Sequence, residues 1–438
     1  MKIVYVGDNR NRGNYGCRAT STALSQIISS NHEIVGRIYG KYTNVDTGEL
    51  FFSKRYPAWI YKKVGKLKYW KYAKTVWYII HRMLKRGKYY FSKYDYLSYD
   101  LDKSIKNLIR CLPANPHMKE FDLRQYDFDA LVVNGEGSFI FATPPWRECL
   151  TEAMLMHWAQ KMGKKVYFLN GMFSDDPYTP RNKRTLEIVK PILEQAELVS
   201  VREQYSYEYA KREFPNANIK LYPDALFSWY KYINDDFQIK DGKYIAGMSG
   251  AFDSSFEQLD FKEPYICVSG SSSVGLASNS EEEIIQKYSV LVEEIKKFYP
   301  YKCYLVEVCE GDAFLREVSK RTNTPFIPID TPILAAGKIL ANAKLYISGR
   351  YHPSILASLG GTPCVFLSSN SHKTKSIQEL LQYNDIKEFS VLPNKKEIKE
   401  ILKEGQKKLD ESDALRKKIK TRAMSLSKET QNQGEELK

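Results

Sequence analysis

The sequence predicts an α/β protein built from two doubly wound, Rossmann-like domains. The chain has 438 residues, which is more than one ordinary hydrophobic core accommodates. Short apolar runs also alternate with segments of helical periodicity along most of its length. That alternation is typical of parallel sheets covered by helices on both faces.

Eight apolar runs have the length and continuity of buried parallel strands. They form two series, separated by a polar, irregular stretch between about 230 and 262. We therefore expect an N-terminal domain at 1–235 and a C-terminal domain at 236–395. Residues 396–438 are rich in Lys and Glu and predict an exposed C-terminal helix with a frayed tail after residue 428. The strand-like runs are 2–6, 130–134, 165–170, 198–201, 265–269, 303–308, 344–348 and 363–367.

A basic segment at 54–93 interrupts the first series. It holds thirteen of the 66 Lys and Arg residues and no Asp or Glu, so it accounts for nearly all of the net charge of +14. Its apolar residues, with three tryptophans, recur at three- or four-residue steps, which predicts a basic amphipathic helical insertion. Such a helix suits an anionic membrane surface. A core-facing helix with a solvated basic side, or a site for an acidic polymer, gives the same pattern. Charge confined to one segment argues against a nucleic-acid-binding protein.

Hydropathy, the N-terminal sequence and the cysteines indicate the cellular compartment and whether disulfides or metal sites are expected. No run of about 18 apolar residues indicates a membrane span, and the N-terminus has no signal-peptide pattern. The seven cysteines are scattered and never form a C-x-x-C pair. We therefore expect a cytoplasmic protein, peripheral at the inner face of the membrane, without a disulfide framework or a metal site.

Two stretches of the first domain have residues suited to ligands. The Gly- and Asn-rich loop 7–20 joins the first strand to a helix, and we expect Asn14, Arg18 and the helix N-terminus to favour an anion there. An ordinary turn is the alternative. The second stretch puts Glu136 between two glycines at a strand end, where ligands of α/β sheets bind. Glu136 is a candidate base or sugar-hydroxyl acceptor, and Asn134 and Trp146 are placed to shape an acceptor pocket.

A third stretch ends the strand run 198–201 with Arg202. The planar guanidinium suits a carboxylate or a pair of phosphate oxygens in the same carboxyl-end crevice. An ion pair with Glu203 or Asp224 is the alternative explanation of this arginine.

The fourth stretch reads as strand, short loop and helix, and it carries Ser348, Arg350 and His352. The helix start favours an anion near Arg350, and histidine is the side chain best suited to proton transfer near neutral pH. Lys373 follows the next strand, where it is placed to close on a phosphate.

Taken together, these stretches resemble the polysaccharide pyruvyl transferase family from about residue 1 to 380. The resemblance implies a GT-B-like fold with the site in the cleft between the two domains. Many relatives have an Asp in the first turn, where this chain has an asparagine and a cysteine. The matching motifs are Asn14-x-Gly16, Asn134-Gly135-Glu136-Gly137, Ser200-x-Arg202, Pro223-Asp224 and Arg350-x-His352.

The resemblance also implies an activity: transfer of pyruvate from phosphoenolpyruvate, as a ketal, to a sugar of a bacterial surface glycan. No cofactor is implied, and a lipid-linked glycan is the expected acceptor. The expected catalytic residues are His352, Arg350, Arg202 and Glu136. The expected donor-binding residues are Arg202, Arg350, His352, Ser348, Lys373, Asn14 and Arg18, and the acceptor-binding residues are Asn134, Glu136 and Trp146.

Two other functions stay open at this point. A GT-B glycosyltransferase of capsule or O-antigen assembly would use a nucleotide sugar, and Glu307 or Glu310 would then be candidates for binding its ribose. A non-enzymatic membrane or polyanion adaptor would explain residues 54–93, but not the arginine and histidine motifs.

Overall fold

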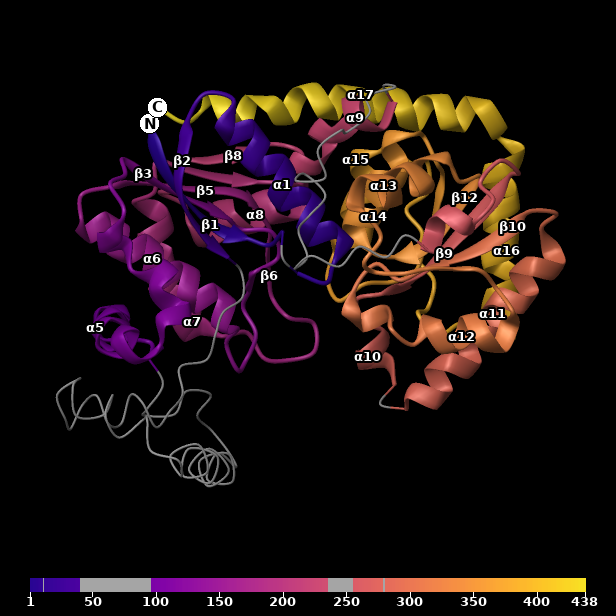
Figure 1. Cartoon of the computed structure of the whole chain (residues 1–438), viewed down its shortest axis with the longest axis horizontal. Helices are drawn as coiled ribbons and strands as arrows, with labels where there is room; N and C mark the ends of the chain where they lie inside the picture. The colour runs from indigo at the N-terminus through magenta and orange to yellow at the C-terminus, as the bar shows by residue number, and fades with distance from the viewer. Residues whose placement is uncertain (11, 40–95, 235–254, 279) are drawn as a thin grey trace.

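The computed structural model describes residues 1–10, 12–39, 96–234, 255–278 and 280–438. Two parallel sheets lie side by side within these residues, each flanked by helices (Figure 1). The prediction of two doubly wound α/β units is confirmed. The predicted insertion at 54–93 lies outside the described residues, as does 235–254 in the polar stretch between the two strand series.

The N-terminal sheet has six parallel strands in the order β2-β1-β3-β5-β7-β8. A short pair, β4 (Phe139–Ile140) and β6 (Phe173–Ser174), lies beside it. The six strands are β1 (Lys2–Asp8), β2 (Glu33–Tyr39), β3 (Ala130–Asn134), β5 (Lys165–Gly171), β7 (Leu198–Val201) and β8 (Ile219–Leu221). The helices of this part are α1 (Tyr15–Ser29), α5 (Leu101–Cys111), α6 (Arg147–Lys161), α7 (Lys183–Glu194), α8 (Gln204–Glu213) and α9 (Tyr230–Asn234), with the 3₁₀ turn η4 (Ala225–Trp229).

The C-terminal sheet has five parallel strands in the order β11-β10-β9-β12-β13. They are β9 (Tyr265–Ser271), β10 (Lys302–Val306), β11 (Phe326–Ile327), β12 (Leu345–Gly349) and β13 (Cys364–Phe366). The helices are α10 (Val274–Ala277), α11 (Glu281–Phe298), α12 (Leu315–Thr322), α13 (Ile333–Asn342), α14 (Tyr351–Leu359), α15 (Lys373–Leu380), α16 (Lys395–Asp410) and α17 (Ser412–Glu435).

The strand order reverses once in each sheet, between β1 and β3 and between β9 and β12. Loops that leave the carboxyl ends of two such strands turn to opposite faces of the sheet, and the crevice between them is where ligands of open α/β sheets bind. The loops after β1 and β3 carry Asn9 and Glu136, and those after β9 and β12 carry Ser272 and Arg350. The topology therefore marks these four loops as the candidate site.

The two sheets are packed into one molecule by a shared apolar cluster. It includes Tyr5 of β1, Leu24 of α1, Phe227 of η4, Leu356 of α14 and Tyr346 of β12. Each sheet has a second cluster on its other face, formed with α5, α6 and α7 in the first domain and with α11, α12 and α16 in the second. Helices α1, α14 and η4 thus fix the two halves against each other.

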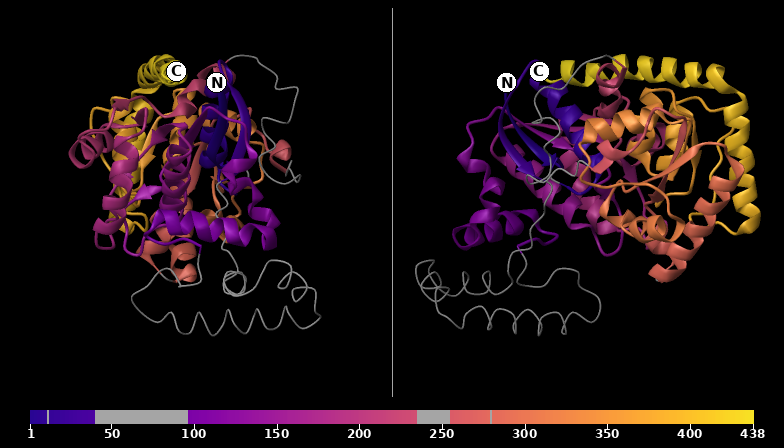
Figure 2. Two further views of the ribbon diagram at one scale, coloured as in Figure 1. Left: turned by 90° about the vertical axis from the view of Figure 1, so that its left-hand side faces the viewer. Right: turned by 45° about the vertical axis from the view of Figure 1, so that its right-hand side comes forward.

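Helix α17 runs back along both domains and brings the C-terminus beside the N-terminus (Figures 1 and 2). Thr430 and Gln433 are fully buried, and both donate to the Pro223 carbonyl, at 2.8 and 3.0 Å. The Lys165 ammonium donates to the backbone oxygen of Lys438 at 2.6 Å. The expectation of a frayed tail after residue 428 is therefore wrong. Small polar side chains bind backbone carbonyls of the first domain there, so packing continues where the apolar pattern ends.

The predicted membrane association involves a surface and not a span. Among the residues that the structure describes, no helix is both long enough and apolar enough to cross a bilayer.

Candidate active site

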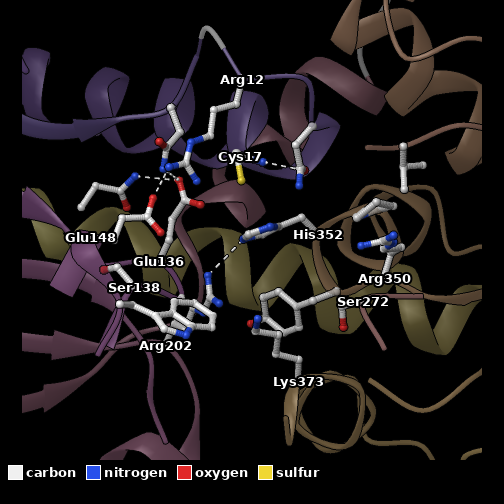
Figure 3. A pocket seen from close by; sticks show the side chains of 18 of the residues that line it. Arg12, Cys17, Glu136, Ser138, Glu148, Arg202, Ser272, Arg350, His352 and Lys373 are labelled. Atoms are coloured by element: carbon white, nitrogen blue, oxygen red, sulfur yellow. Dashed lines mark hydrogen bonds and ion pairs between the residues drawn. The ribbon is translucent and has the colours of Figure 1, made fainter. Parts of the chain in front are cut away.

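A cavity of about 190 Å³ lies between the domains, where the loops from both switch points meet (Figure 3). Carboxylates gather on the N-terminal side of the cavity, and Arg350 and Lys373 lie across from them. Its lining residues are Asn9, Arg12, Asn14, Cys17, Asn134, Glu136, Gly137, Ser138, Trp146, Glu148, Glu152, Arg202, Ser272, Val308, Gly349, Arg350, Tyr351, His352, Pro353 and Lys373.

Glu136 follows β3 with a backbone φ of +31°, a conformation that side chains other than glycine rarely adopt. Its Oε1 accepts hydrogen bonds from the Asn9 amide at 2.9 Å, the Ser21 hydroxyl at 2.9 Å and the Asn134 amide at 3.0 Å. Because all three bonds converge on one oxygen, the carboxylate has a fixed orientation at the cavity wall. A fixed carboxylate of this kind suits a general base or a hydroxyl acceptor.

The neighbouring part of the N-terminal wall is also acidic. Arg12 forms an ion pair with Glu148, and Ser138 donates to Glu152 at 2.6 Å. Burial raises the pKa of Glu148, although Arg12 opposes this effect. Trp146 precedes α6 and also lines the cavity. An aromatic ring beside carboxylates offers apolar contact together with acceptors for hydroxyl groups.

Arg202, Asp224 and His352 form a buried cluster at the centre of the site. The Arg202 guanidinium is 1% exposed and donates to Asp224 Oδ2 at 2.9 Å, and His352 Nε2 lies 3.1 Å from the same oxygen. The other oxygen of Asp224 accepts from the Thr20 hydroxyl at 2.8 Å and from the Leu226 amide at 2.9 Å.

Burial alone would raise the pKa of Asp224, but His352 and Arg202 hold it below its usual value. The carboxylate thus stays ionised and orients both the guanidinium and the imidazole. Arg202 makes the predicted ion pair with Asp224, which confirms the structural explanation, and it also lines the cavity, so the ion pair leaves it in a position to meet a ligand.

Arg350 and Lys373 form the cationic wall of the C-terminal domain. Arg350 precedes α14 and donates to Asp312, a fully buried carboxylate. Burial would lower the pKa of Arg350, but Asp312 raises it above the usual value. Lys373 begins α15, and burial together with Arg202 and Arg350 lowers its pKa to about 8. Arg202, Arg350 and Lys373 therefore all line the one cavity.

The two arginines have hydrogen-bonding capacity to spare. Each pairs with one carboxylate, and the Nε of each is buried without a hydrogen-bond partner among the described residues. Buried N–H groups nearly always have an acceptor, and these two belong to side chains that line the cavity. An anion with several oxygens would supply such acceptors.

The Asn14-x-Gly16 motif has a structural explanation. Asn14 caps α1 by accepting from the Cys17 amide at 3.2 Å. A Cβ atom on Gly16 would lie 2.5 Å from His352 Nδ1, so only glycine leaves room for the imidazole. Burial and the nearby Glu136 raise the pKa of Cys17, which keeps its thiol protonated.

The structure brings most of the predicted site residues together, but not Arg18 and Ser348. Arg18 is buried on α1 and donates to the Ile329 carbonyl at 2.6 Å, because it lies one turn into the helix and faces the second domain. Ser348 points into the sheet and donates to the Gly270 carbonyl at 3.2 Å. Neither lines the cavity. The predicted donor-binding role of both residues is therefore unsupported by their positions.

Other lining or supporting residues were missed in the sequence. Asp312 follows β10 in an irregular turn, and nothing local connects it with Arg350, 38 residues away. Arg12 and Glu148 are 136 residues apart, so nothing in the sequence indicates that they pair. Ser272 had one available signal, because it lies just beyond the carboxyl end of a predicted strand, 265–269, which the structure extends to Ser271 as β9.

The nucleotide-sugar alternative required a ribose carboxylate in the second half. Glu307 instead pairs with Arg316 at 2.8 Å, and neither Glu307 nor Glu310 lines the cavity. Within the described residues, no group of three or more His, Cys, Asp or Glu side chains is arranged to hold a metal ion.

Comparison with solved structures places the fold among GT-B-like proteins. UDP-GlcNAc 2-epimerase from Neisseria meningitidis, bound to UDP-GlcNAc, matches with a TM-score of 0.53 and 11% identity over 98% of this chain and 99% of that chain. Os79 from O. sativa in complex with UDP matches with a TM-score of 0.49 and 12% identity over 98% and 96%. The match to the epimerase, at 11% identity, shows the fold alone. The two-domain GT-B-like prediction is thus confirmed.

The family is shown by the sequence. The family model described as polysaccharide pyruvyl transferase matches residues 14–371, which is most of the chain. The chain belongs to the polysaccharide pyruvyl transferase family. No curated protein matches the chain.

Proposed function

We propose that the enzyme transfers pyruvate from phosphoenolpyruvate to two hydroxyl groups of a glycan sugar, forming a ketal. The observation that carries the proposal is the convergence of Arg202, Arg350 and Lys373 on one small cavity. Phosphoenolpyruvate has two anionic groups, a carboxylate and a phosphate, and the arginines have unpaired N–H donors to offer them.

His352 is the proposed proton donor. Its Nε2 faces Arg202 at 3.0 Å, so a donor carboxylate held by this arginine lies beside the imidazole. Asp224 stabilises the protonated ring until the proton moves to the methylene carbon of the enol. The proton turns that methylene into a methyl group and leaves an oxocarbenium-like centre on the neighbouring carbon. The carboxylate and the phosphate of the donor stabilise the positive charge of this centre.

Two hydroxyl groups of the acceptor then complete the ketal. The first attacks the oxocarbenium-like carbon, and Glu136 accepts its proton. Phosphate leaves as the bond between that carbon and the bridging oxygen breaks, and the second hydroxyl closes the ring. Glu136 then passes the first hydroxyl proton to the departing phosphate, and the proton of the second hydroxyl restores the protonated state of His352. The reaction therefore balances without a redox or nucleotide cofactor.

We also propose that the acceptor is a lipid-linked glycan and that the basic segment 54–93 brings the enzyme to the anionic inner face of the cytoplasmic membrane. Each Lys or Arg near such a surface contributes about 1 kcal/mol. Trp146 and the carboxylates of the N-terminal wall would hold the uncharged sugar, while the cations of the opposite wall hold the donor.

One comparison tests the donor. Purified enzyme is incubated with a lipid-linked glycan extract and either phosphoenolpyruvate or sugar nucleotides. We expect phosphate release from phosphoenolpyruvate that depends on the extract. Release of UDP or CMP from sugar nucleotides, without phosphate release, would refute the proposal and support a glycosyltransferase.

A further inference from the structure

A second set of contacts joins the two domains directly beside the cavity. His372 Nε2 of the C-terminal domain lies 2.9 Å from Glu203 Oε1 of the N-terminal domain. The Tyr205 ring stacks on the His372 imidazole with centroids 5.0 Å apart, and the Tyr205 hydroxyl donates to Glu379 at 2.6 Å. We call Glu203, Tyr205, His372 and Glu379 the clasp. They make two polar contacts and one ring contact between the domains.

The clasp is adjacent in sequence to two cations of the cavity. Glu203 follows Arg202, and His372 precedes Lys373, the first residue of α15. The Lys373 side chain extends to the N-terminal domain. Its Nζ lies so close to Gly137 that a Cβ atom on this glycine would be 3.3 Å away. A shift of one domain against the other at the clasp would therefore move Lys373 relative to Arg202.

The Glu203 carboxylate is built to receive the histidine. It is buried and fixed as the cap of α8, where both of its oxygens accept from the Ser206 amide at 3.1 Å. Burial would raise the pKa of Glu203, but the hydrogen bond and charge of His372 lower it. A hydrogen bond to a buried charged group is among the stronger polar contacts in a protein.

We propose that Glu203 and His372 are positioning residues: the clasp sets the position of Lys373 against the donor and so controls donor affinity. The identity of the donor rests on the proposed function, but the clasp itself does not. Neither residue lines the cavity, so both act through their neighbours. Loss of the clasp lowers the fraction of enzyme with Lys373 in place, and apparent donor affinity falls by the same factor.

The kinetic test compares His372→Ala with a matched control. We expect the donor KM to rise roughly tenfold, the equivalent of one charge-assisted hydrogen bond, while kcat stays near the wild-type value. The control is His157→Ala, because His157 Nε2 makes the same kind of contact with Asp102, at 3.0 Å, but inside the N-terminal domain. An unchanged KM in His372→Ala, or an equal rise in the control, would overturn the proposal.

A second measurement does not depend on the donor. Hydrogen exchange at the start of α15 should increase in His372→Ala and in Glu203→Ala, and the double variant should exchange no faster than the more affected single one. Exchange rates that increase additively in the double variant, or that do not increase in the single variants, would refute the proposal that Glu203 and His372 position α15 together. If wild-type enzyme releases no phosphate from phosphoenolpyruvate while exchange behaves as expected, the proposed function fails and the clasp stands.

Discussion

Replacing Asp224 by Asn removes the carboxylate that orients Arg202 and His352 in the site. Arg202 and Asp224 are 1% and 0% exposed, and their 2.9 Å ion pair has little access to water. Leaving one partner of such a pair uncompensated costs about 3–5 kcal/mol. The amide retains an acceptor oxygen, so we expect the unfolding free energy of Asp224→Asn to fall by about 3 kcal/mol at pH 7.

The pH dependence of this loss gives a second readout. The pKa of Asp224 is lowered in the folded state, so its contribution to stability is complete above the unfolded pKa of about 3.9 and is lost as the pH falls further. The difference between wild type and Asp224→Asn should therefore be constant from about pH 5 to 7 and shrink below about pH 4.

Denaturant unfolding followed by circular dichroism measures both effects. The matched control is Asp127→Asn, because Asp127 pairs with Lys2 at 2.6 Å but both side chains are exposed. We expect the control to unfold like wild type. If Asp224→Asn were as stable as the control, or if its deficit grew on acidification, the account of a buried, ionised orienting carboxylate would be wrong.

Three further predictions concern the donor site and the C-terminus. His352→Ala should lower kcat by a factor on the order of 10²–10⁴ with little change in donor binding, whereas Arg350→Ala should raise the donor KM and also lower kcat; kinetics per folded molecule would contradict this if His352→Ala turned over at the wild-type rate. Lys373 has a pKa lowered to about 8, so donor affinity should fall as the pH rises through that value and the ammonium is lost; Lys373→Met should abolish the dependence, and its persistence would assign it to another group. Deletion of residues 430–438 should lower the melting temperature by several degrees, because it removes the buried Thr430 and Gln433. An unchanged melting temperature, as expected for the loss of an exposed helix end, would refute this packing.

The sequence predicted central features of the fold better than peripheral ones. Continuous apolar runs such as 130–134 and 198–201 matched strands because parallel strands buried on both faces leave no polar alternation. Strands β2, β8 and β11 were not predicted, since they lie at sheet edges and are short or carry polar side chains. The C-terminal tail was misinterpreted because its buried contacts are polar and its partners lie some 200 residues away.

The candidate site was predictable to the extent that it sits at strand ends. Arg202 and Arg350 directly follow a β-strand and Glu136 follows one at the second residue, and parallel topology brings those ends to one edge of each sheet. The partners that hold them, such as Asp312, come from distant turns and are recognisable only once the chain is folded. The predicted donor-binding role of Arg18 failed for a related reason. Its charge suggested an anionic ligand, but its position on the helix directs the side chain to a backbone carbonyl of the other domain.

The most direct test of the central claim follows the pyruvate itself. Enzyme, lipid-linked glycan and phosphoenolpyruvate labelled with carbon-13 at the phosphate-bearing carbon are examined by carbon NMR and by mass spectrometry of the glycan. We expect a labelled ketal carbon bonded to two oxygens of one sugar, in amounts equal to the phosphate released. A glycan that gains a sugar from a nucleotide donor, with the label left in phosphoenolpyruvate, would contradict this expectation.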